Sequence, residues 1–430
     1  MRVLIRLAGL CGMVLTPLMA GEFRLAPPAP SLDRWVYPFG DFGGDRPVAP
    51  TFASFDPRFD TRDAQALFGW DTASQLATNS GPDRYLIRRV RIGLTIQADQ
   101  KFVYDPSFDP FQTFLTNHPA AVPDSDPGRP VELYGAGYRN GFSDETWTET
   151  SPFGAVYPIT STNIALGTRN VFAAMHGEDG RLMDVSNNVG QYNAAWTHAP
   201  FEVRPWALGL TTNAGVGELV PAGARFVFEV DLADPQVAGY FQAALDSGRL
   251  RVVVSSLSPA IQITPGGIGG GGNGDYPQWV TRENLLFDGP DAPSLEMEGT
   301  LVGDDDTDQD GHPDDWERFW FRDLSPTRDS DSDQDGATDA EERVAGTDPS
   351  RAASRLQILA VGFDAGAARL RFTIAPSRRY RVEASPVLGG WSLVSGETRY
   401  PEPGVAEFVG SPGGQASGSD ARFFRVVVEE

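Results

Sequence analysis

The chain has 430 residues with 58 acidic and 35 basic side chains, which gives a formal net charge of -23 and a pI of about 4.5. Binding to nucleic acid needs a basic face that releases counterions, so this charge argues against nucleic acid and against anionic membrane surfaces as partners. Apolar residues make up 40% of the chain, enough for packed cores, and 47 glycines with 34 prolines favour many short strands. The length predicts two or three domains.

Residues 1–20 are typical of a secretory signal peptide. Arg2 and Arg6 precede a short apolar run, and the small residues Ala20 and Gly21 follow it. The run is too short to span a bilayer, so we expect no membrane span in the mature chain. We expect export to the cell surface or the medium, with the periplasm as an alternative. The single cysteine lies in this segment, which leaves the mature chain without disulfides or cysteine-ligated zinc.

Residues 21–300 are expected to form one large, jelly-roll-like antiparallel β-sandwich with long loops. Apolar and polar residues alternate over residues 90–96 and 226–232, the period of a strand with one buried face. Asp234 followed by proline then predicts a helix start, and Gly248 predicts its end. Another strand is expected directly after this helix.

Two glycine-rich stretches interrupt this region. Residues 134–142 place aromatics among glycines, which predicts a turn between strands with core aromatics, or alternatively a platform on which sugar rings stack. Residues 266–274 contain a G-x-G-x-x-G match, but no helix pattern follows it, so we expect a flexible loop. The tryptophans of the region are expected to be packed in the core: Trp147, Trp196, Trp206 and Trp279.

Residues 355–430 again show strand periodicity. Alternation recurs over residues 370–374 and 380–384, and a last strand is expected over residues 422–428. We expect a second, small β-sandwich here. The expected fold class is therefore mainly β, with two sandwiches and a short helix-containing segment between them.

That segment, residues 304–350, carries 17 acidic residues and four arginines, a net charge of -13. Its acidic residues are not randomly placed. The twelve residues 306–317 and the twelve residues 331–342 share one pattern, with oxygen ligands at positions 1, 3, 5, 9 and 12 and glycine at position 6. A calcium ion needs six to eight oxygen ligands on a chain that wraps around it, a glycine at the sharpest turn and a bidentate glutamate at position 12.

The spacing thus predicts two calcium ions, each followed by a short helix. Magnesium is a poorer match because it keeps its own waters. Carboxylates are expected at positions 1, 3 and 5, a main-chain carbonyl at position 7, a carboxylate at position 9 that acts directly or through water, and the bidentate glutamate at 12. In the first loop these are Asp306, Asp308, Asp310, His312, Asp314 and Glu317; in the second they are Asp331, Asp333, Asp335, Ala337, Asp339 and Glu342.

These residues resemble the EF-hand-like calcium repeats of dockerins and of thrombospondin type 3 modules, which occur in secreted modular bacterial proteins. The resemblance covers residues 306–349 and includes the closing Gly-Thr-Asp-Pro of the second repeat. It implies calcium binding. A cohesin partner is only weakly implied, since the last loop position differs from the usual dockerin residue, and the cysteines of thrombospondin arrays are missing. By pattern alone, the flanking regions resemble a carbohydrate-binding-module-like sandwich and a small terminal sandwich.

The sequence favours a secreted, calcium-binding protein without catalysis that recognises a polysaccharide or a cell-surface protein. The four histidines have no ligand spacing, and neither H-E-x-x-H nor G-x-S-x-G occurs. The alternative is an extracellular glycan-processing enzyme that uses a pair of carboxylates. With so many acidic residues, the sequence alone does not select such a pair.

Overall fold

The computed structural model describes residues 21–39, 45–54, 59–115, 119–155, 167–189, 199–260, 275–284, 286, 291–364, 367–411 and 423–429. The predicted signal peptide and the glycine-rich stretch 266–274 lie outside these residues. Over the described ranges, none of the helices has the length and apolar character that a membrane crossing requires.

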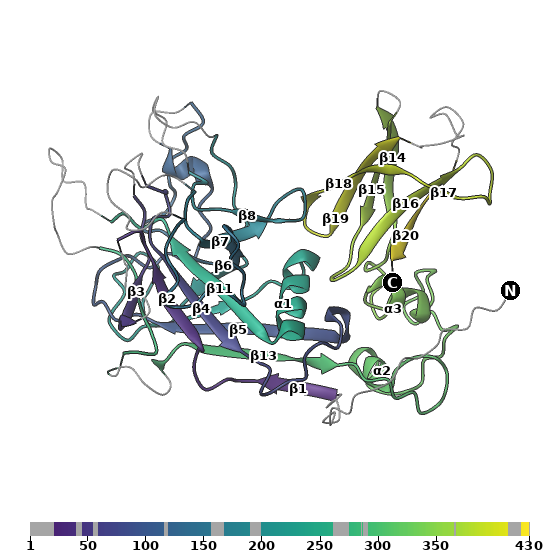
Figure 1. The fold of residues 1–430 in the computed structure, drawn as a ribbon, viewed down its shortest axis with the longest axis horizontal. Helices are drawn as coiled ribbons and strands as arrows, with labels where there is room; N and C mark the ends of the chain where they lie inside the picture. The colour runs from purple at the N-terminus through teal and green to yellow at the C-terminus, as the bar shows by residue number, and fades with distance from the viewer. Residues whose placement is uncertain are drawn as a thin grey trace.

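The N-terminal β unit is built on one curled antiparallel sheet of eleven strands (Figure 1). Nine of them follow one another in the order β1 (Gly21–Leu25), β13 (Ser294–Leu301), β5 (Tyr85–Thr95), β10 (Arg225–Glu229), β9 (Ala207–Leu210), β6 (Val131–Tyr138), β11 (Arg249–Ser256), β4 (Gln65–Asp71) and β2 (Leu32–Val36). The short strand β9 pairs with both β10 and β6. The sheet therefore turns at β9, and its two halves form the layers of a sandwich.

Shorter elements complete this unit. They are β7 (Val171–His176) beside β6, β8 (Leu182–Asp184) beside β7, the pair β3 (Val48–Pro50) and β12 (Gln278–Val280), and the 3-10 turns η2 (Pro82–Arg84) and η3 (Phe111–Phe114). The main core contains Phe226, Phe228 and Trp279, whose rings meet edge to face. A second buried cluster covers the other face of β4, β6 and β11, so these strands are buried along almost their whole length.

Helix α1 (Pro235–Ser247) is where the sequence predicted it. The carboxylate of Asp234 accepts a hydrogen bond from the Gln236 N–H at 2.9 Å, and Gly248 ends the helix with φ of 74°. The apolar face of α1 buries Phe241 and Leu245 in the main core. The strands predicted on either side of it are present as β10 and β11.

The turn expected over residues 134–142 is confined to residues 139–142, where the Phe142 N–H donates to the Arg139 carbonyl at 3.2 Å, because residues up to Tyr138 belong to strand β6. The aromatics expected in the core are there: Tyr134 is buried, and Tyr138 and Phe142 pack against its cluster. The glycines of β6 make room for rings: a Cβ on Gly135 would lie 2.1 Å from the Trp206 ring, and one on Gly137 would lie 2.2 Å from the Phe172 ring. Tyr134 is fully buried, which excludes it as a sugar platform. As predicted, Trp147, Trp206 and Trp279 are buried; Trp196 lies outside the described residues.

The C-terminal β unit is a small sandwich of two antiparallel sheets. One has the order β14 (Ile358–Asp364), β15 (Ala367–Thr373), β19 (Val405–Ser411) and β18 (Ser395–Glu402); the other has β17 (Ser392–Leu393), β16 (Arg379–Ser385) and β20 (Phe423–Glu429). Leu370, Phe372, Val382 and Phe408 pack between the sheets. The mainly-β fold class with two β-sandwiches is confirmed.

The connecting segment carries α2 (Asp314–Trp320) and α3 (Asp339–Ala345) and lies against both β units (Figure 1). Arg88 of β5 donates to the Phe319 carbonyl at 3.2 Å and lies over its ring. Arg378, beside β16, donates to the Val344 carbonyl at 2.9 Å, where α3 ends. The β units also meet directly, since Arg378 pairs with Asp83 at 3.2 Å.

Candidate metal centres

The two acidic loops have the same backbone course. At position 4, Gln309 and Gln334 have φ of 64° and 62°; at position 6, Gly311 and Gly336 both have φ of 97°. This value at position 6 favours glycine strongly, because a Cβ would strain the turn there. The repeat seen in the sequence is therefore also a repeat in backbone geometry.

The first aspartate of each loop fixes the turn. The carboxylate of Asp306 accepts hydrogen bonds from the N–H groups of Asp310, at 3.2 Å, and Gly311, at 3.0 Å. Asp331 accepts from Asp335 and Gly336 at 3.1 and 3.0 Å. These bonds fold the chain back so that the side chains at positions 3 and 5 approach position 1.

Positions 1, 3 and 5 converge in both loops. Each of these aspartates offers a carboxylate oxygen that lies within 4.8 Å of the others, in one cluster of Asp306, Asp308 and Asp310 and another of Asp331, Asp333 and Asp335. Two ligands of one calcium ion, at about 2.3–2.6 Å each, are at most about 5 Å apart. The spacing of the oxygens therefore suits one calcium ion per loop.

The position-12 glutamates are almost fully buried and lie near the aspartates of their own loops. Both carboxylate oxygens of Glu317 are buried without a hydrogen-bond partner among the described residues. Glu342 has one such oxygen, while its other oxygen accepts from the Thr347 hydroxyl at 2.9 Å. Burial, together with the nearby aspartates, raises the pKa of each glutamate to about 7.

The position-9 aspartates have hydrogen-bond partners within the protein. Asp314 accepts from the N–H and the hydroxyl of Thr307 at 2.7 and 2.6 Å. Asp339 does the same with Ser332 at 3.0 and 2.7 Å. These bonds tie position 2 of each loop to the start of its helix, a role that the sequence did not predict. Direct or water-mediated ligation by Asp314 and Asp339 stays a prediction.

Position 7 was expected to supply its main-chain carbonyl, from His312 and Ala337. The side chain of His312 is buried, and its ring stacks on Trp316 with 4.8 Å between ring centroids. Burial lowers the pKa of this histidine, so its ring is neutral at pH 7. The ring thus packs α2 against the first loop, and the predicted ligand remains the carbonyl.

Several buried carboxylate oxygens in the two loops have no hydrogen-bond partner among the described residues, and these oxygens are the candidate ligands of a cation. In the first loop they belong to Asp310 and Glu317, and in the second to Asp333, Asp335 and Glu342. A buried carboxylate oxygen without a partner costs several kcal/mol unless a cation or a proton neutralises it. These carboxylate oxygens are hard donors of the kind that calcium prefers. The residues present therefore fit the predicted ions.

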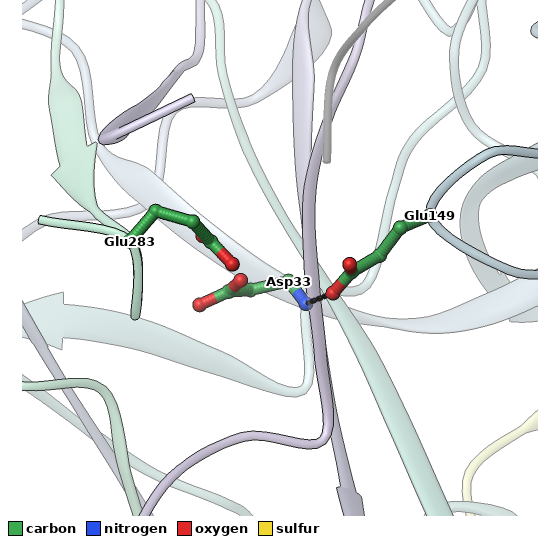
Figure 2. Close-up of side chains that lie close together, drawn as sticks. All are labelled: Asp33, Glu149 and Glu283. Atoms are coloured by element: carbon green, nitrogen blue, oxygen red, sulfur yellow. Dashed lines mark hydrogen bonds between the residues drawn. The ribbon is translucent and has the colours of Figure 1, made fainter. Parts of the chain in front are cut away.

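Sequence reasoning missed two further acidic clusters, both in the N-terminal unit. One joins Asp33 of β2 to Glu149 and Glu283, and Figure 2 shows the carboxylates of Asp33 and Glu283 facing each other. Arg282 neutralises much of this cluster: its guanidinium donates to Glu149 and, at 2.8 Å, to Glu283, and its N–H donates to Asp33 at 2.7 Å.

Asp33 is fully buried, and one of its oxygens has no hydrogen-bond partner among the described residues. Burial raises its pKa to about 8. Because Asp33 and Glu283 face each other, a proton held between them explains the pair without a metal ion. The second cluster consists of Asp105, Asp109 and Asp126. The alternation of Asp124 and Asp126 is the one local signal that could have indicated it.

Comparisons with family models, curated proteins and solved structures found no match to this chain. The resemblance to dockerin and thrombospondin type 3 repeats therefore depends on the loop residues themselves.

Proposed function

We propose that the protein is an extracellular calcium-binding protein without catalysis, in which two calcium ions order the segment between two β-sandwich units. The observation that carries the proposal is the set of buried, unpaired carboxylate oxygens in each loop. Bound calcium supplies two positive charges per loop and satisfies these oxygens. The resemblance to EF-hand-like repeats of secreted proteins supports the same function and location.

Contacts around each loop join it to the neighbouring helix and linker, so that fixing the loop also fixes these segments. Asp314 and Asp339 begin α2 and α3, so a fixed loop also fixes its helix. The second loop is tied to the linker that follows it, because Arg355 donates to the Asp335 carbonyl at 2.7 Å. Calcium in the loops would thereby set how the two β units are joined.

A groove at this junction is the place where we propose that a polysaccharide or a surface protein binds. It has a volume of about 1110 Å³ and is lined by both β units and the connecting segment. Phe319 and Trp320 of α2, both partly exposed, contribute aromatic surface to it. Aromatic rings beside charged groups are suited to sugar rings or to an extended chain.

The alternative, a glycan-processing enzyme, would need a carboxylate pair beside such a groove. Asp83, Asp304, Asp348 and Glu429 do line it, but Asp83 pairs with Arg378 and Asp304 with Arg84. The closely spaced Asp33 and Glu283 line neither this groove nor the smaller cavity beside Trp206. Binding without turnover is therefore the function that the geometry supports better.

Calcium calorimetry on the full chain tests the metal proposal. Asp306→Ala and Asp331→Ala should each lower the number of bound ions by one, and the double variant by two. Asp329→Ala, an exposed residue between the loops, removes the same charge and should leave the number unchanged. If the double variant binds as many ions as the wild type at millimolar calcium, the proposal is wrong.

Glycan-array binding tests the groove. Wild-type protein should bind a polysaccharide in calcium, and Trp320→Ala should weaken this binding at least ~10-fold, while Trp391→Ala, outside the groove, should not. Turnover of any glycan would instead support the enzyme alternative.

A further inference from the structure

The cluster of Asp105, Asp109 and Asp126 lies in the N-terminal unit, apart from the two loops. Asp105 and Asp109 precede η3, and Asp126 lies in the segment that leads to β6. Each offers a carboxylate oxygen within 4.8 Å of the other two. Asp105 is 2% exposed and Asp109 is 5% exposed, while Asp126 is half-buried.

Only some of the carboxylate oxygens in this cluster accept a hydrogen bond. One oxygen of Asp105 accepts from the N–H and the hydroxyl of Ser107, at 2.8 and 2.5 Å. The same hydroxyl lies 3.0 Å from Asp126, but it has one proton to donate. Asp105 Oδ2 and Asp126 Oδ1 are both buried and have no hydrogen-bond partner among the described residues.

The charges around the cluster do not balance. Within the described residues, Arg129 is the basic side chain that pairs with it, through Asp109 at 3.0 Å and through the neighbouring Asp124. Four aspartates and one arginine leave a formal charge of -3, and Arg129 makes no ion pair with Asp105 or Asp126. Burial raises the pKa of Asp109 to about 6 and raises that of Asp105. Without a further cation, ionised carboxylates are therefore costly here.

We propose that Asp105, Asp109 and Asp126 form a third calcium site, which belongs to the N-terminal unit and is independent of the two loops. Three convergent carboxylates at this spacing match the short oxygen distances around calcium. The ion would neutralise the two unpaired oxygens, Asp105 Oδ2 and Asp126 Oδ1. Arg129 cannot replace it, because its guanidinium pairs with Asp109 and Asp124. The Asp33 cluster differs, because Arg282 contacts all three of its acidic residues.

Such a site would tie two segments of the N-terminal unit together. Residues 104–110 and 124–129 are joined directly by Ser107 and Arg129. A calcium ion would add bonds from both segments to one centre and should stabilise this unit without the connecting segment.

Equilibrium dialysis of the full-length protein against calcium at pH 7.5 tests the third site. Three bound ions are expected for the wild type and one for the Asp306→Ala/Asp331→Ala double variant, in which the N-terminal cluster is intact. Adding Asp126→Asn to the double variant should abolish the remaining binding. Adding Asp33→Asn instead should preserve it, and circular dichroism should show that each variant is folded.

The outcomes separate this site from the loops. Two ions in the wild type and none in the folded double variant would overturn the third site while supporting the loop sites. One ion in both proteins would support the third site and contradict the loops. A single ion in the double variant that persists after Asp126→Asn in folded protein would place the binding elsewhere and also overturn the inference.

Discussion

Arg343, on the helix of the second acidic-loop repeat, donates a hydrogen bond from Nη2 to the main-chain carbonyl of Gly311 in the first loop, at 3.2 Å. Gly311 directly precedes His312, whose carbonyl is a predicted ligand. The carbonyl of Arg343 accepts from Arg378 of the C-terminal unit at 3.0 Å. One side chain thus connects the first loop with the second repeat, and through it with the C-terminal unit.

This contact predicts positive cooperativity between the two loops. Calcium in the second loop fixes α3, and α3 holds the donor for the first loop. Arg343→Gln should bring the Hill coefficient of loop binding close to 1 and weaken the first site ~5-fold, the loss of about one hydrogen bond. The measurement is calcium calorimetry. Arg351→Gln, an exposed arginine after the second repeat, should leave the cooperativity intact; an unchanged curve for Arg343→Gln would contradict the coupling.

The position-12 glutamate of the second loop has a hydrogen-bond donor beside it, and the glutamate of the first loop does not have one among the described residues. The hydroxyl of Thr347 holds one oxygen of Glu342, whereas neither oxygen of Glu317 has a hydrogen-bond partner among the described residues. Thr347→Val should weaken calcium binding at the second loop about 10- to 100-fold, the usual effect of removing a group that orients a ligand. In an Asp306→Ala/Asp126→Asn background, which lacks the first loop site and the proposed third site, calorimetry reports on the second loop directly. In an Asp331→Ala/Asp126→Asn background, Thr347→Val should have no effect on the first loop.

The buried Asp33 predicts a pH dependence of stability. With its pKa raised to about 8, the folded chain holds a proton between about pH 4 and pH 8 that the unfolded chain releases. The free energy of unfolding should therefore fall as pH rises through this window, by up to ~1.4 kcal/mol per pH unit from this group. Chemical denaturation of wild type and Asp33→Asn at pH 5 and pH 7.5 should show a flatter dependence in the variant. Asp99→Asn, at an exposed position, should retain the wild-type slope.

Removal of calcium should expose the connecting segment first. Arg322 and Arg328 are exposed between the two loops, so trypsin should cut there in chelator and release both β units intact. Calcium at a hundredfold excess over Kd should slow this cleavage about 100-fold per ion that must leave. Gel electrophoresis over time checks both rates. Faster loss of the N-terminal unit than of the segment would show that the loops are integral to that core.

The convergence of the aspartates in each acidic loop could be predicted from the sequence because the predicted ligands of one loop lie within twelve consecutive residues. The same is true of α1, whose capping residues Asp234 and Gly248 border its own segment. The Asp33 cluster could not be predicted, because Glu283 is 250 residues away along the chain and acidic residues are frequent. Long-range packing also explains why the predicted turn begins only after Tyr138: local glycine content suggested a loop at Gly135, where the Trp206 ring requires a glycine within a strand.

The central claim, that each acidic loop binds one calcium ion, is tested most directly by a crystal structure of the full chain grown in calcium, with anomalous difference density recorded at a long wavelength. The account predicts one peak in each loop, about 2.3–2.6 Å from oxygens at positions 1, 3, 5, 7 and 12. In the first loop these are Asp306, Asp308, Asp310, the His312 carbonyl and Glu317. Well-ordered loops without such peaks, with Glu317 and Glu342 paired to protein groups, would contradict it.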